Sequence, residues 1–130
     1  MAQPAFGLLL QRLREERRLS LREFGQLAEL DHAYIHRLES GEKDSPSEET
    51  QSKLVRALKA SKREGDVLRY LAEHAGADPG LVDYMLSDAT VTTEEFRTLA
   101  GTAFRGTGRS DYAKQVQRVR RYLAEASEDG

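Results

Sequence analysis

Apolar residues return at helical spacing along the whole chain, and this pattern predicts most of its elements. The first group consists of Phe6, Leu9, Leu10 and Leu13. Its i, i+3, i+4, i+7 spacing forms one face of a helix and predicts a first helix over residues 6–17. Runs of β-branched residues, which favour strands, are scarce in this sequence. We therefore expect an all-α fold.

The stretch from Ser20 to Gly41 is predicted to form two short helices joined by a tight turn. Its core-facing positions are Leu21, Phe24 and Ala28 in the first helix, Ile35 and Leu38 in the second, and Leu30 at the corner. Asp31 is placed to cap the second helix, because its carboxylate can accept hydrogen bonds from the unpaired N–H groups there. Gly41 is the expected helix stop.

The outward side of this second helix carries only small or hydrogen-bonding side chains. They belong to His32, Ala33, His36, Arg37 and Ser40. A helix that enters a DNA major groove needs short side chains for close approach and hydrogen-bond donors for the base edges. We therefore interpret residues 32–40 as a DNA-recognition helix.

The segment SLREFGQLAELDHAYIHRLESG, followed by a Pro-Ser loop and another helix, resembles the helix-turn-helix of the Cro/phage-repressor type, the XRE family. The resemblance implies a lambda-repressor-like, DNA-binding N-terminal domain over residues 1–62. Arg37 is then expected to read a guanine through its bidentate fork, while His32 and Ala33 approach neighbouring bases. The other expected DNA contacts are Gln26, Tyr34, His36, Ser40 and Lys43.

Three residues depart from the usual pattern of this family. Glu29 occupies the turn position where the family usually has Gly, whose positive φ strains any other residue. Gly25 replaces the usual Ala at the contact between the two helices. Asp31 places a negative charge near the DNA, where Ser or Thr is commoner.

Helix signals continue through the second half of the chain. Ser47 follows a polar loop and can cap a fourth helix, Asp78–Pro79 offers a cap followed by a first-turn Pro, and Thr92–Glu95 is a capping box. The polar segment 60–65 is interpreted as a domain boundary. Residues 63–130 are therefore expected to form a small helical C-terminal dimerisation domain.

The last predicted helix, residues 111–126, carries a narrow apolar seam. The seam residues are Tyr112, Val116, Val119 and Leu123. Such a seam packs either inside the domain or against a second copy of the chain. We predict a homodimer that presents two recognition helices to the half-sites of a palindromic operator.

The segment from Glu95 to Glu125 resembles the C-terminal part of repressors cut by ImmA/IrrE-type metalloproteases. The resemblance depends on Phe96, Leu99, the run Phe104-Arg105-Gly106 and the Tyr122-Leu123 end. It implies inactivation by cleavage near Phe104 and Arg105 after stress, with such a metalloprotease as a partner. The Gly-rich run 105–110 also fits an exposed linker between helices or a phosphate-binding nest.

Charge is distributed unevenly between the two halves of the chain, whose formal net charge is −2. Residues 1–63 carry 12 basic and 10 acidic residues, whereas residues 64–130 carry 8 and 12. This asymmetry has the sign expected for a DNA-binding half joined to an acidic interaction half. It is mild, so we expect a modest sequence-independent attraction to phosphates.

The composition also limits the chemistry that the chain is expected to perform. It has no Cys, hence no disulfide or thiolate zinc site, and no apolar run long enough for a membrane span, so we expect a cytoplasmic protein. His32 and His36 lie four apart but lack a third metal ligand at sensible spacing. We expect no metal, no cofactor and no catalysis. The alternative to a repressor is an antitoxin or adaptor whose C-terminal half binds a partner protein.

Overall fold

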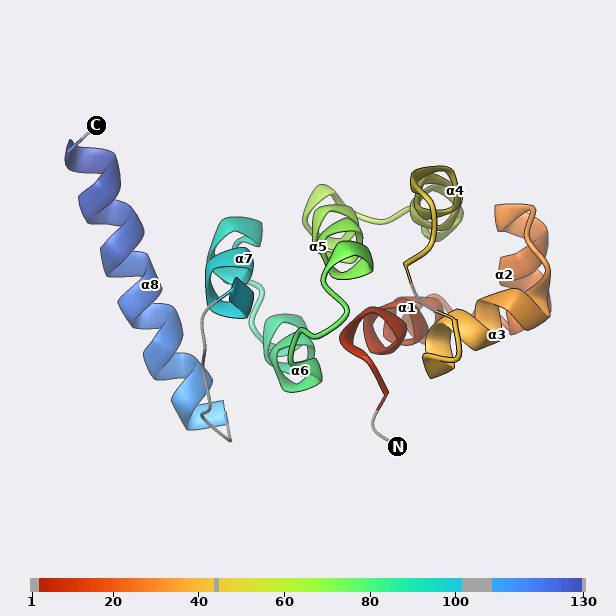
Figure 1. Cartoon of the computed structure of the whole chain (residues 1–130), viewed down its shortest axis with the longest axis horizontal. Helices are drawn as coiled ribbons and strands as arrows, with labels where there is room; N and C mark the ends of the chain where they lie inside the picture. Colours follow the sequence, from red (N-terminus) through yellow and green to blue (C-terminus); the bar gives the residue numbers. More distant parts are fainter. Residues whose placement is uncertain (1–2, 44, 102–108, 130) are drawn as a thin grey trace. The chain divides into compact units, whose positions relative to one another are not determined.

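The computed structural model describes residues 3–43, 45–101 and 109–129, and within these ranges the chain consists of helices and connections without strands (Figure 1). The helices are α1 (Ala5–Glu16), α2 (Leu21–Ala28), α3 (His32–Ser40), α4 (Glu48–Leu58), α5 (Lys62–Glu73), α6 (Pro79–Ser87), α7 (Thr93–Gly101) and α8 (Arg109–Asp129). The predicted all-α fold is confirmed. No helix of the described ranges is long and apolar enough to cross a membrane.

The chain divides into two compact units, Met1–Pro79 (unit 1) and Gly80–Gly130 (unit 2). The sequence places a boundary at residue 62, but α5 packs against α1 and α4 and so lies in unit 1. The reason is that α5 carries its own apolar stripe, and the side chains of Val67, Leu68 and Leu71 are almost fully buried. A functional division at residue 62 stays a prediction.

The predicted helix caps are confirmed in unit 1. The Asp31 carboxylate accepts from the Ala33 N–H at 2.9 Å, and the Ser47 hydroxyl accepts from the Thr50 N–H at 3.2 Å. Gly41 ends α3 with φ +87°, a left-handed conformation that glycine adopts without a Cβ clash. Each cap satisfies a backbone group that a helix end leaves unpaired.

The core of unit 1 comes from all five of its helices. Its largest fully buried side chains are Leu9, Leu10 and Leu13 of α1, Phe24 of α2, Ile35 and Leu38 of α3, Leu54 and Leu58 of α4, and Leu68 and Leu71 of α5. Gly7 lets α1 approach α3 closely, since a Cβ there would lie 2.2 Å from the carbonyl oxygen of Glu39. A side chain at position 7 would force the two helices apart.

Unit 2 is a smaller assembly of α6, α7 and α8. The capping box predicted at Thr92 and Glu95 is confirmed by reciprocal hydrogen bonds of 2.9 and 3.1 Å. Glu95 is 7% exposed and pairs with Arg120 of α8 at 2.9 Å. This pair ties the start of α7 to the middle of α8, and Phe96 and Met85 fill the apolar centre beside it.

Most of the predicted dimer seam is already buried within one chain. Tyr112, Val116 and Val119 are 7%, 1% and 8% exposed. Leu123 is half-buried. The spacing allows the seam to pack inside the domain or against a second copy of the chain. In unit 2, three of its four residues are already covered within one chain. Assignment of these residues to a dimer interface stays a prediction.

Candidate nucleic-acid interface

The turn between α2 and α3 is tight because of two backbone features. Glu29 ends α2 in the left-handed region, at φ 57° and ψ 43°, where the sequence pattern expects glycine. Gly25 gives the returning chain room, since a Cβ there would lie 2.7 Å from the Leu30 carbonyl oxygen and 3.2 Å from the His32 nitrogen. The Leu30 N–H donates to the Gly25 carbonyl at 2.9 Å and closes the turn.

A bidentate ion pair holds α3 against α1. Arg14 donates from Nε and Nη2 to the two carboxylate oxygens of Glu39, at 2.7 and 3.0 Å, and from Nη1 to the Leu19 carbonyl at 2.8 Å. Glu39 is only 3% exposed. The hydrogen bond to Glu39 raises the pKa of Arg14 above its usual value. The inner face of α3 is thus fixed while its outer face remains open.

Arg17, the C-cap residue of α1, has a second structural role. It pairs with Glu64 of α5 at 2.9 Å and donates to the Leu13 and Leu58 carbonyls. Arg14 and Arg17 therefore have structural roles, because their guanidinium groups connect helices within unit 1.

The outward positions predicted from the sequence are accessible on α3 and beside it. The side chains of Gln26, His32, His36, Arg37, Ser40 and Lys43 are exposed, and those of Ala33 and Tyr34 are half-buried. Ile35 and Leu38 are buried, which orients the helix. The Lys43 N–H donates to the Arg37 carbonyl at 3.1 Å, so the chain after Gly41 folds back onto the end of α3.

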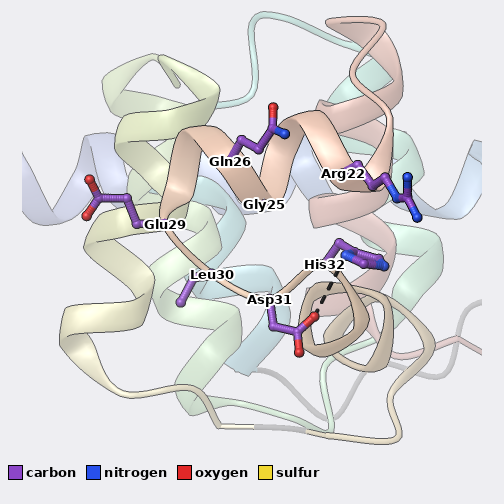
Figure 2. Close-up of a pocket in the computed structure, with 7 residues that line it drawn as sticks. All are labelled: Arg22, Gly25, Gln26, Glu29, Leu30, Asp31 and His32. Carbon is purple, nitrogen blue, oxygen red and sulfur yellow. Dashed lines mark ion pairs between the residues drawn. The ribbon is translucent and has the colours of Figure 1, made fainter.

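An open hollow lies beside the α2–α3 turn (Figure 2). It is lined by Arg22, Gly25, Gln26, Glu29, Leu30, Asp31 and His32. Asp31 faces His32, with 3.8 Å between Oδ1 and Nδ1. Figure 2 shows Arg22 and His32 on the same side of the hollow, with Glu29 toward its other end. Polar groups of both signs therefore line the entrance to α3.

Arg22 is the residue of this surface that the sequence analysis missed. It is exposed in the first turn of α2, one helical turn before Gln26 on the same face. That i, i+4 relationship was readable from the sequence.

Phe104 and Arg105, the predicted cleavage residues, lie outside the described residues.

His32 and His36 do not belong to a recognisable metal site in the part of the chain that the structure describes. No group of three or more His, Asp or Glu residues is placed there to hold an ion. Arg37 lies between the two histidines and Ser40, and its side chain makes no hydrogen bond with another described residue. Within these residues, the outer face of α3 offers hydrogen-bond donors rather than a ligand cage.

Comparison with known families agrees with this geometry. Residues 5–68 match the model of a family described as a helix-turn-helix domain, whereas no curated protein matches the chain. The matched segment covers α1 to α4 and the first half of α5. The N-terminal half is thus a helix-turn-helix domain of the Cro/phage-repressor (XRE) class. This is a class of DNA-binding regulators, and it is typically not enzymatic.

Proposed function

We propose that this protein is a sequence-specific transcriptional repressor that reads the major groove of its operator with α3. The observation that supports the proposal most is the two-sided character of this helix. Its inner face is held by Leu38 and by the Arg14–Glu39 pair, while Arg37 is exposed on its outer face. A rigidly held donor is what base readout requires, because a bidentate contact tolerates little misplacement.

Within this proposal the exposed residues divide into two groups. Arg37 reads a guanine, and His32, Ala33 and His36 approach the neighbouring base pairs. The second group contacts phosphates and fixes the register of the helix on the duplex. It consists of Gln26, Tyr34, Ser40 and Lys43, and we add Arg22 because it is exposed in the first turn of α2, one helical turn before Gln26.

Repression follows from occupancy of an operator that overlaps a promoter. Binding of a palindromic operator by a homodimer remains part of the proposal, since two linked half-site contacts bind more tightly than one. Three of the four seam residues, Tyr112, Val116 and Val119, are buried within the chain. The fourth, Leu123, is partly accessible. A dimer contact is therefore expected near the end of α8 rather than along its whole length.

Inactivation by cleavage near Phe104 and Arg105 remains a hypothesis from the sequence. It requires that an ImmA/IrrE-type metalloprotease separate α8 from the rest of the chain. Co-expression with such an enzyme and measurement of the intact mass test it directly. No observation on the described residues favours the antitoxin or adaptor alternative.

The proposed function is tested by base-specific binding. A genomic footprint of the protein supplies the operator, and titrations then compare operator with random duplex DNA. Arg37→Ala is expected to lose roughly 1–3 kcal/mol on the operator and little on random DNA. Arg56→Ala, at an exposed position on α4, serves as the control and should change neither. Equal weakening on both duplexes would reduce Arg37 to a phosphate contact and refute the readout.

A further inference from the structure

α8 carries a basic stripe, which we define as Lys114, Arg118 and Arg121. All three side chains are exposed. Their i, i+4, i+7 spacing places them within one narrow face of the helix. Tyr112, Val116 and Val119 are buried on the opposite face. The basic stripe therefore points away from the core of unit 2.

The stripe is not neutralised by the described surroundings. None of its three cations forms an ion pair or hydrogen bond with another described residue. Arg120, which lies between the two faces, differs in that it pairs with Glu95. Glu125 continues the same face one turn after Arg121 and marks the end of the basic run.

Like charges at these spacings work against the helix that carries them. Each i, i+4 pair of equal charge destabilises a helix by roughly 0.2–0.5 kcal/mol. The surrounding half of the chain is acidic overall, with 8 basic and 12 acidic residues in the range 64–130. Three neighbouring cations that pair with no described residue, in a half of the chain with more acidic than basic residues, fit an anionic partner.

We propose that the basic stripe binds the phosphate backbone of duplex DNA and gives the protein a second, sequence-independent DNA contact. This inference goes beyond base readout by α3, but it rests on the proposed function to bring DNA to the chain. The three cations span about 10 Å along the helix axis at 1.5 Å per residue. One DNA strand presents a phosphate about every 3.4 Å of helix axis, so this length matches about three phosphates.

A second copy of the chain fits the stripe less well than DNA does. In a two-fold contact through this face, Arg118 and Arg121 would meet the same cations of the partner, and like charges across an interface cost affinity. A phosphate backbone instead offers only the opposite charge. Tyr122, 64% exposed beside Arg121, adds a hydroxyl that can donate to a phosphate.

The salt dependence of binding to random duplex DNA tests the proposal. In the full-length chain, the triple variant Lys114→Gln, Arg118→Gln and Arg121→Gln should lower the slope of log affinity against log salt by up to about 2.7. The matched control changes Arg56, Lys59 and Lys62 of the α4–α5 region to Gln, with the same change in net charge. The slope of the control should differ from the wild-type slope by no more than one phosphate contact contributes, which is about 0.9.

The outcomes separate this proposal from the proposed function. A wild-type slope in the α8 variant, or an equal fall in the control, overturns the second contact even if Arg37→Ala still loses operator specificity. A reduced slope confined to the α8 variant supports it, whatever Arg37→Ala does. If only the binding of a poly-glutamate peptide falls, the stripe takes an acidic protein segment and the proposal is wrong. Far-UV circular dichroism checks that each variant is folded.

Discussion

Arg14 of α1 and Glu39 of α3 form a bidentate ion pair, with 2.7 Å between Nε and Oε2 and 3.0 Å between Nη2 and Oε1. The side chains are 13% and 4% exposed. A buried pair of this kind does not add much stability over an apolar pair, but it leaves a costly charge behind when one partner is removed. Its main effect here is to fix α3 on α1.

The first prediction concerns this pair. Glu39→Gln should destabilise unit 1 by on the order of 3 kcal/mol, because the Arg14 guanidinium loses its counter-charge in a poorly hydrated place. The double variant Arg14→Met with Glu39→Leu should recover most of that loss. Urea unfolding followed by circular dichroism measures both. A double variant no more stable than the single one would mean that the pair is itself a major stabiliser.

The second prediction concerns the close approach of α2 and α3. Gly25→Ala installs the residue usual in this family and gains about 1 kcal/mol of helix propensity. It should nevertheless destabilise the domain, because the new Cβ would meet the Leu30 carbonyl at 2.7 Å. Gly101→Ala on α7, where a Cβ meets nothing within 4 Å, should stabilise by about 0.5–1 kcal/mol. If both variants were more stable than the wild type, the α2–α3 turn would accommodate a Cβ at position 25.

The third prediction concerns the acidic cap of α3. Asp31→Ser keeps a capping oxygen but removes a negative charge next to His32, so stability should change little. Affinity for random DNA should rise by roughly 0.5–1 kcal/mol at low salt and less at high salt. Asp31→Ala is the control, because it removes the same charge together with the cap and should cost about 1 kcal/mol of stability. An unchanged affinity for Asp31→Ser would place this carboxylate away from the phosphates.

The fourth prediction is a pH dependence at Glu64. Burial favours its neutral form, but the Ser61 N–H and the Arg17 guanidinium outweigh that effect and lower the pKa of Glu64 below its usual value of 4.5. A group with a lowered folded-state pKa stabilises the fold above its unfolded pKa and loses this contribution as the pH falls through the folded one. Stability should therefore decline below about pH 4.5.

Glu64→Gln keeps a side chain that can serve the capping box with Ser61 but cannot ionise. Between neutral pH and a pH below the folded-state pKa of Glu64, the unfolding free energy of this variant should fall less than that of the wild type. Glu73→Gln, at an exposed position on the same helix, should follow the wild-type curve. Identical acid profiles for Glu64→Gln and the wild type would contradict the prediction.

Much of the local structure is encoded in short stretches of the sequence. The caps at Asp31, Ser47 and Thr92 were readable because capping depends on residues within one turn of the helix end. The outer face of α3 followed equally from the alternation of buried Ile35 and Leu38 with polar neighbours. These features need no knowledge of what packs from elsewhere in the chain.

Long-range partners were decided only by the tertiary structure. Arg14 and Arg17 are three residues apart in the sequence, but their acceptors, Glu39 and Glu64, lie 25 and 47 residues further along the chain. Nothing in a local pattern selects one carboxylate among many at such distances. The limits of unit 1 depended in the same way on α5, whose apolar stripe packs back onto α1 and α4.

The last helix illustrates the same division. Its periodicity determined which residues form the apolar seam, because helical spacing alone places Tyr112, Val116 and Val119 on one side. Periodicity does not say which surface covers a seam, and folding brings α7 to that side of α8 within the same chain. That packing leaves the other side of α8 exposed, and the basic stripe lies there. The sequence alone did not distinguish this stripe from an ordinary solvated face.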